Sequence, residues 1–335
     1  MRLITIEEHY MSKTINKGYQ AVAEETGQTI APEKAQFVAD YLANNSDISD
    51  ISQGRINFMD QAGVDVQLLS YGNNSPMTLR GPQAIDLCRE ANDELAQACQ
   101  HYSDRLYGLA CLPLTDPQAA SIELKRTVEE LGFRGALIQG TFQGQFLDDP
   151  SFWPIFEQAE ALEVPIQFHP GEVLPAVQAT YYQGNFSDQV AMILAGHGIG
   201  WHYETGIHVL RLILSGVFDR YPRLQVILGH WGELLPYFIG RFDEMLPQTL
   251  TGLEQPISYY FKHNLYLTPS GMYDEAPMRL CLDTVGPERI LWSMDFPYVK
   301  RLDSQEFLLV LGLDQHSLDL ITHRNADELF KLADK

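Results

Sequence analysis

The sequence of 335 residues has few basic side chains, few cysteines and no long apolar run. Its 23 basic against 44 acidic residues give a formal net charge of −21, which would repel phosphate backbones and anionic membrane surfaces. Four widely spaced cysteines without a CxxC pair argue against a disulfide framework and a thiolate metal site. No run of about 18 apolar residues and no apolar signal region is present. We therefore expect a cytoplasmic protein that binds neither nucleic acid nor membranes.

The chain does contain short apolar, β-branched runs that alternate with amphipathic segments, a pattern typical of parallel strands connected by helices. The predicted strands are Leu3–Ile6, Val66–Ser70, Leu106–Cys111, Ala136–Gln139, Pro165–His169, Gln225–Gly229, Leu265–Thr268 and Arg289–Ser293. The predicted helices are Gln53–Ala62, Gln83–His101, Pro117–Glu130, Phe152–Ala161, Glu204–Val217, Leu234–Met245, Asp274–Thr284 and Ala326–Ala333.

Eight strand–helix units favour an α/β fold of the TIM (β/α)₈ barrel type over two doubly wound domains. No linker rich in proline, glycine or serine divides the sequence, so we expect residues 1–335 to form a single domain. Two long stretches, about residues 10–50 and 170–203, interrupt the rhythm as inserted loops. Both follow predicted strands and would lie over the active face of the barrel.

Polar side chains capable of binding a metal follow three of the predicted strands. Glu7 and His9 follow the first, His169 ends the fifth, and Asp295 lies just beyond the last. The carboxyl ends of barrel strands meet at one mouth, and strand alternation puts Glu7 and His9 on one face with Glu8 on the other. A lone histidine is more often structural, but aliphatic residues would be expected at all four positions. Imidazole with carboxylate suits Zn²⁺, Mn²⁺ or Fe²⁺, so the pattern predicts a metal site.

A second polar pair, His230 and Glu233, stands where a predicted strand passes into a helix. A carboxylate bound to an imidazole fixes its tautomer and raises its basicity, which prepares a general acid or base. The alternative is that Glu233 is simply a negative charge at a helix start.

At these positions the sequence resembles one branch of the amidohydrolase superfamily. That branch contains γ-resorcylate, 2,3-dihydroxybenzoate, 5-carboxyvanillate and aminocarboxymuconate-semialdehyde decarboxylases. The resemblance runs nearly end to end. It is carried by residues 6–9 (IEEH), 59–65 (MDQAGVD), 152–154 (FWP), 164–171 (VPIQFHPG), 204–205 (ET), 211–219 (RLILSGVFD), 228–233 (LGHWGE), 293–297 (SMDFP) and 325–326 (NA).

The resemblance implies that the family's E-x-H pair falls on Glu7 and His9, with His169 and Asp295 completing the ligand set. Many relatives bridge two metals with a carboxylated lysine on the fourth strand, but residues 135–140 read GALIQG here. Because no lysine is available, we expect one divalent ion, Mn²⁺ or Zn²⁺.

The implied activity is non-oxidative decarboxylation of a small hydroxylated aromatic acid. Asp295, supported by His230 and Glu233, would deliver a proton to the ring carbon that bears the carboxylate. Two alternatives stay open from sequence. One is a hydrolase of an ester, lactone or amide that uses a metal-bound water, and the other is a non-catalytic barrel with a structural metal.

Five residues are candidates for contacting the substrate. Arg241 matches a family arginine, although an exposed helix arginine is an equal alternative, and Arg55 is a weaker candidate. Tyr71, Asn74 and His202 stand in loops whose sequences are individual to this chain. An aromatic near a helix start, such as Trp201 beside His202, can also be simple packing. Since relatives form dimers or tetramers, we expect a homodimer or homotetramer.

Overall fold

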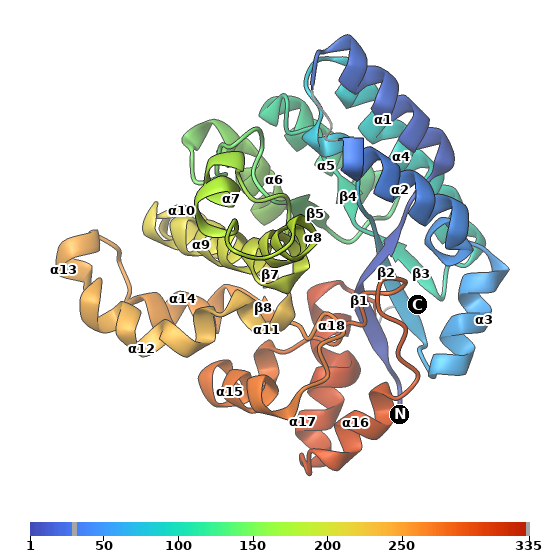
Figure 1. Cartoon of the computed structure of the whole chain (residues 1–335). Coiled ribbons are helices and arrows are strands. Elements are labelled where there is room, and N and C mark those ends of the chain that lie inside the picture. The colour runs from blue at the N-terminus through green and yellow to red at the C-terminus, as the bar shows by residue number, and fades with distance from the viewer. Residues whose placement is uncertain (29–31, 333–335) are drawn as a thin grey trace.

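Eight parallel strands form the centre of the protein in the computed structural model, which describes residues 1–28 and 32–332 (Figure 1). They are β1 (Ile4–Tyr10), β2 (Val66–Tyr71), β3 (Leu106–Gly108), β4 (Ala110–Cys111), β5 (Ala136–Gln139), β6 (Ile166–His169), β7 (Val226–Leu228) and β8 (Leu265–Leu267). The ladders run in the orders β1-β2-β3 and β4-β5-β6-β7-β8.

The two ladders are parts of one ring. β3 and β4 are halves of the predicted strand Leu106–Cys111, interrupted at Leu109, whose amide donates to the Leu69 carbonyl at 2.8 Å. On the other side, residues 290–293 bridge β8 and β1 through the pairs Leu267–Ile290 and Ile6–Ser293. This segment is the predicted eighth strand, present as single bridges. The predicted TIM barrel is confirmed.

Helices surround the ring. Those that follow strands are α3 (Gln53–Ala62), α4 (Gln83–His101), α5 (Pro117–Glu129), α6 (Trp153–Leu162), α9 (Gly200–Leu214), α10 (Val217–Arg220), α11 (His230–Glu233), α12 (Leu235–Met245), α13 (Gln248–Thr251), α14 (Ile257–His263) and α15 (Glu275–Val285). The last part of the chain forms α16 (Ser304–Val310), α17 (Gln315–Asp319) and α18 (Asn325–Leu329). The predicted tail helix therefore ends early, at Leu329, and its last residue, Ala333, lies outside the described residues.

The two predicted insertions are largely helical. The first contains α1 (Lys13–Glu25) and α2 (Pro32–Asn44), and the second contains α7 (Pro175–Tyr181) and α8 (Asp188–Ile193). α9 begins at Gly200, four residues before the predicted start at Glu204, so that Trp201 and His202 lie in its first turn. The Thr205 hydroxyl donates to the Trp201 carbonyl at 2.7 Å and stabilises this extra turn.

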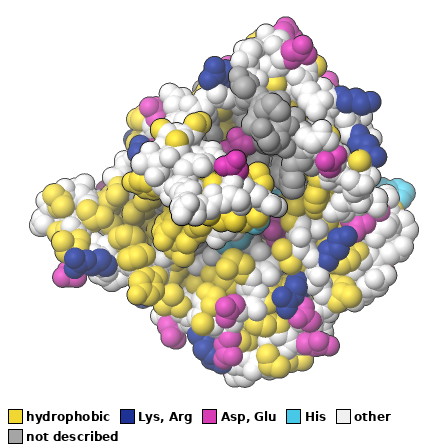
Figure 2. Space-filling view, viewed as in Figure 1, with side chains coloured by type: hydrophobic (Ala, Val, Ile, Leu, Met, Phe, Trp, Pro, Cys, Tyr) yellow, Lys and Arg dark blue, Asp and Glu magenta, His cyan; other side chains and the backbone are white. Residues whose placement is uncertain are grey.

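One continuous apolar cluster extends from Leu3 to Leu332 and supports the strands from all sides. A smaller cluster of Val173, Tyr182 and Ala195 lies within the second insertion. Helices α12, α13 and α14 project from the body as an arm, and apolar side chains gather on its surface (Figures 1 and 2). Within the described residues, no helix combines the length and the apolarity needed to cross a bilayer.

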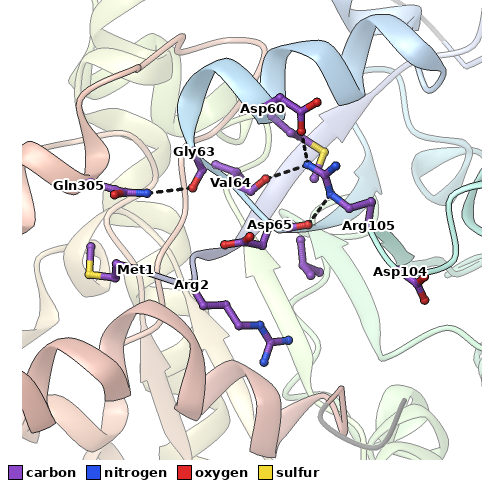
Figure 3. Close-up of a pocket in the computed structure, with 11 residues that line it drawn as sticks. Met1, Arg2, Asp60, Gly63, Val64, Asp65, Asp104, Arg105 and Gln305 are labelled. Atoms are coloured by element: carbon purple, nitrogen blue, oxygen red, sulfur yellow. Dashed lines mark hydrogen bonds and ion pairs between the residues drawn. The ribbon is translucent and has the colours of Figure 1, made fainter.

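A cavity of about 550 Å³ lies at the amino ends of β1, β2 and β3, the face of the barrel opposite the predicted site (Figure 3). Arg105 closes one side of it by donating to Asp60 Oδ1 at 2.8 Å and to the Asp65 carbonyl at 2.7 Å. These contacts join α3 to the loops before β2 and β3. Side chains on this face of a barrel generally serve stability.

Candidate metal centre

The predicted ligands converge at the carboxyl ends of the strands. Atoms of His9, His169 and Asp295 that could bind a metal lie within 4.8 Å of one another. His9 Nε2 is 3.2 Å from Asp295 Oδ1, and His169 Nε2 is 3.8 Å from Glu7 Oε1. Histidine and acidic side chains are visible in a hollow near the centre of the face in Figure 2. Three distant parts of the chain therefore supply one cluster.

Backbone geometry directs Glu7 into this cluster. The ladder between β1 and β2 shifts register between Thr5 and Glu8, and Glu7 has a φ of 62°. A glycine gives it room, because a Cβ on Gly229 would stand 2.6 Å from Glu7 Oε1. Glu7 Oε2 accepts hydrogen bonds from Thr268 Oγ1 at 2.8 Å and Ser270 Oγ at 2.5 Å. Glu7 and His9 thus converge through a bulge and not through simple alternation.

Three of the predicted ligand atoms have no hydrogen-bond partner in the protein. Glu7 Oε1, His9 Nε2 and Asp295 Oδ1 are buried and make no hydrogen bond. Buried polar atoms are normally satisfied. His9 Nε2 and Asp295 Oδ1 face each other at 3.2 Å, and Glu7 Oε1 lies 3.8 Å from His169 Nε2, so a cation at this place would give all of them a partner. The other nitrogen of each imidazole is fixed from behind, His9 Nδ1 by Ser70 Oγ at 3.0 Å and His169 Nδ1 by the Pro170 carbonyl at 2.9 Å. Such backing orients imidazoles toward a metal, and the residues present fit a divalent cation.

Burial sets the charges of the cluster. It raises the pKa of Glu7 to about 7 and that of Asp295 to about 7, and it lowers the pKa of His9 to about 3. The short contact between His9 and Asp295 is therefore not an ion pair, because the imidazole is neutral. A neutral imidazole is the form that binds metals. Burial disfavours the charged form of both Glu7 and Asp295, and a cation bound between the two carboxylates would stabilise that form.

His230 and Glu233 form the predicted pair beside this cluster. His230 Nδ1 donates to Glu233 Oε1 at 2.7 Å, and both side chains are largely buried. Burial lowers the pKa of His230, but the charge and hydrogen bond of Glu233, aided by Glu7 and Asp295, outweigh it and raise the pKa to about 9. Burial also opposes ionisation of Glu233, yet the neighbouring imidazoles hold its pKa below the ordinary value. The pair therefore stores a proton near the predicted metal ligands.

Glu8 faces away from the cluster and fixes the loop that carries Asp295. Its two oxygens accept the amides of Met294 at 2.9 Å and Phe296 at 2.8 Å, on either side of Asp295. The predicted opposite orientation of Glu8 is observed. Its task of holding the Asp295 loop carries no sequence signal, because a strand carboxylate gives no indication of which amides it meets.

Arg55 does not reach the cluster. It is 1% exposed, and its guanidinium donates to the carbonyls of His9 at 2.7 Å and Asp50 at 2.9 Å and to Gln67 Oε1 at 3.3 Å. Its charge also lies 4.9 Å from the centre of the Phe296 ring. The predicted substrate contact by Arg55 does not fit this geometry, because its three nitrogens are engaged by the His9 and Asp50 carbonyls and by the Gln67 side chain.

The other predicted substrate contacts have varied surroundings. The Tyr71 hydroxyl meets the backbone of Ser12, and Asn74 Nδ2 donates to Asn16 Oδ1 at 3.1 Å. His202 Nδ1 meets Glu233 Oε2 at 2.6 Å, which makes His202 a partner of the His230–Glu233 pair.

Arg241 is exposed on the projecting arm and pairs with Glu244 on its own helix at 3.0 Å.

Two aromatic residues that sequence reasoning missed line the approach to the cluster. The Tyr298 ring lies 5.4 Å from the His9 ring, and Tyr41 of α2 stacks on Tyr298 at 5.5 Å. The first insertion therefore covers the barrel mouth. Tyr298 directly follows the SMDFP segment at residues 293–297, and this position was the sequence feature that could have indicated it. No sequence pattern indicated Tyr41.

Comparisons with known proteins agree with this geometry. The sequence profile of the amidohydrolase family matches residues 32–332. The chain belongs to the amidohydrolase family. It is 34% identical to a decarboxylase of Emericella nidulans and 33% identical to a γ-resorcylate decarboxylase of a Polaromonas species, covering 98% of this chain in both cases and 97% and 98% of those proteins. The predicted resemblance to the decarboxylase branch is confirmed.

A solved structure of 5-carboxyvanillate decarboxylase from Novosphingobium aromaticivorans has the same fold. It superposes with a TM-score of 0.87 at 29% identity, covering 98% of this chain and 96% of the other. That crystal contains manganese and 4-hydroxy-3-methoxy-5-nitrobenzoic acid.

Proposed function

We propose that the protein is a metal-dependent decarboxylase that removes CO₂ from small hydroxylated aromatic acids. The observation that carries this proposal is the convergence of His9, His169 and Asp295, with Glu7 against His169, beside the proton-holding pair His230–Glu233. Similarity to decarboxylases over nearly the whole chain supports it.

Glu7, His9, His169 and Asp295 would hold one divalent ion. Bound there, the ion would supply a Lewis acid and a template for a carboxylate and its neighbouring hydroxyl. Manganese in the related 5-carboxyvanillate decarboxylase structure supports Mn²⁺ as the ion, and Zn²⁺ also suits this ligand set.

The protein's own residues would manage the proton. Asp295 would protonate the ring carbon that bears the carboxylate, forming a C–H bond and breaking the aromaticity of the ring. The bond to the carboxylate then breaks, CO₂ leaves, and its bonding electrons restore the aromatic ring. His230, with a pKa raised to about 9, is protonated at neutral pH and can return a proton to Asp295. Glu233 fixes the His230 ring during both steps.

A panel of ortho-hydroxylated aromatic acids, run after exchange into Mn²⁺ and Zn²⁺, tests this proposal. We expect release of CO₂ and the matching phenol from at least one acid, such as 2,6-dihydroxybenzoate. The alternative hydrolase would instead open esters, lactones or amides, since the same ligands can activate water. Hydrolysis without CO₂ release would contradict the decarboxylase proposal.

We also propose that Arg241 contacts substrate only in an assembly of two or more copies. Arg241 lies on α12, which belongs to the arm that projects from the barrel body. Exposed Tyr237, Phe238 and Met245 lie on the same helix. Such a patch of large apolar side chains is typical of an association surface. An Arg241→Ala variant should raise KM, and sedimentation of a Tyr237→Glu variant should show smaller particles if this face joins the copies.

Two further expectations from sequence stand as proposals. The large apolar cluster from Leu3 to Leu332, which includes residues of the first insertion, supports one domain over residues 1–335, and the second insertion adds a small cluster of its own. The four free cysteines support a reducing, cytoplasmic location. Limited proteolysis would test the single domain, and fractionation of cells would test the location.

A further inference from the structure

Glu233 has two oxygens, and each is engaged by a different histidine. Oε1 meets His230 Nδ1 at 2.7 Å, and Oε2 meets His202 Nδ1 at 2.6 Å. The His202 and His230 rings lie 4.5 Å apart, with Glu233 fully buried beneath them. A buried carboxylate with both oxygens occupied cannot rotate without losing a hydrogen bond.

Trp201 determines the tautomer of His202. Its indole Nε1–H, which can only donate, meets His202 Nε2 at 3.1 Å. Nε2 must therefore be the accepting nitrogen, so the proton of the neutral ring is on Nδ1, where it is donated to Glu233. Trp201 therefore donates to His202, and both His202 Nδ1 and His230 Nδ1 donate to Glu233. His230 Nε2 is the ring nitrogen that these contacts leave free.

The fold holds this arrangement from the second insertion. Gly206 lets α9 approach closely, because a Cβ there would stand 2.6 Å from the Glu233 carbonyl. The Trp201 ring packs against the apolar cluster of Val173, Tyr182 and Ala195 in that insertion. The position of Glu233 thus depends on residues that sequence reasoning placed in the substrate pocket.

We propose that Trp201 and His202 are positioning residues that orient Glu233, and through it His230, for proton delivery, and do not contact the substrate. The inference rests on the decarboxylase function proposed above. It corrects the predicted substrate contact by His202 because neither nitrogen of its ring is free. The three side chains of His202, His230 and Glu233 could alternatively hold a second metal, but their ligand atoms already satisfy one another.

Four variants test the proposal. Trp201→Phe removes only the N–H, His202→Ala removes the Glu233 contact, and His202→Asn keeps an N–H donor on a short side chain. Trp153→Phe is the matched control, because it removes an equivalent indole hydrogen bond, 3.1 Å to the Asp148 carbonyl, on the outer helix α6.

In a steady-state assay of CO₂ release, we expect His202→Ala to lower kcat by about 10- to 100-fold, as for other residues that orient a site. Trp201→Phe should lower it by about three- to tenfold, as for one lost hydrogen bond. His202→Asn should recover much of the loss, Trp153→Phe should match wild type, and KM should change by less than about twofold throughout. A raised KM with unchanged kcat in His202→Ala would overturn the proposal and restore the substrate contact.

A second readout needs no turnover. In zinc-loaded protein with ¹⁵N-labelled histidine, we expect the His202 signals to show the Nδ1–H tautomer in wild type and Trp153→Phe, and to change in Trp201→Phe. The opposite tautomer in wild type, or two metal ions per chain falling to one in His202→Ala, would overturn the proposal. Wild-type protein that shows the expected tautomer but releases no CO₂ would instead contradict the proposed function alone.

Discussion

Glu7 and Glu8 are neighbours in sequence and equally buried, yet they belong to two different kinds of polar cluster. Glu8 and Arg55 lie behind β1, where backbone amides engage both Glu8 oxygens and Arg55 donates to backbone carbonyls. Glu7 and His9 lie at the mouth, and each has one buried atom without a partner. Burial of charge is common to both clusters. The binding site differs from the structural brace because some of its buried polar atoms have no hydrogen-bond partner in the protein.

The variant with the largest expected effect on activity is Asp295→Asn, which tests the role of the cluster at the barrel mouth. The amide retains the shape but loses the negative charge and the acidic carboxyl proton, so we expect kcat to fall by at least about 10³-fold. The fold should persist because Glu8 still holds the amides on either side. Circular dichroism and CO₂ release measure the two effects separately. Activity within tenfold of wild type would remove Asp295 from the proton path.

Arg55→Met should have the reverse profile. It leaves the carbonyls of His9 and Asp50 without their buried donor, so we expect the free energy of unfolding to fall by about 3 kcal/mol in urea titrations. KM of the folded fraction should stay near the wild-type value. Unchanged stability with a KM raised more than tenfold would restore Arg55 to the substrate pocket.

Glu7 and Asp295 should destabilise the metal-free protein progressively as the pH rises. Burial raises the pKa of Glu7 from 4.5, and that of Asp295 from 3.8, to about 7 in the folded state. These two carboxyl groups therefore hold more protons in the folded than in the unfolded state from about pH 4 to 7, and their contribution to stability falls with rising pH across that interval. Thermal melts should show a larger gain in Tm from Mn²⁺ at pH 7 than at pH 5. An equal gain at both values would mean that these carboxylates do not meet the ion.

The smallest expected effect is a shift in the pH profile of Glu233→Gln. Glu233 contributes the charge and hydrogen bond that hold the pKa of His230 above its ordinary value of 6.5, at about 9. If protonated His230 returns the proton to Asp295, activity falls as the pH rises through the pKa of His230. Replacing Glu233 should move this fall to lower pH in the kcat profile. An unmoved basic limb would show that another group supplies the proton.

Periodicity predicted most of the fold. Helices Gln53–Ala62 and Gln83–His101 match the predicted bounds, because their apolar stripes and ends are clear in the sequence. The strand Leu106–Cys111 was predicted whole but divides at Leu109, where its neighbour changes from β2 to β5. Such a change of partner depends on the closure of the ring, which no local pattern encodes.

The metal ligands could be predicted because they stand at the carboxyl ends of predicted strands. Glu7, His9, His169 and Asp295 could be chosen because barrel strands end at one mouth. The hydroxyls of Thr268 and Ser270 on Glu7 could not, since serine and threonine are common in loops and carry no spacing signal.

The most direct measurement of the central claim is the metal content of wild-type protein and His9→Ala, with CO₂ release from the same samples. The account predicts about one divalent ion per chain and activity in wild type, and neither in a folded His9→Ala. Wild-type protein without a stoichiometric ion, or His9→Ala that keeps both ion and activity, would contradict it.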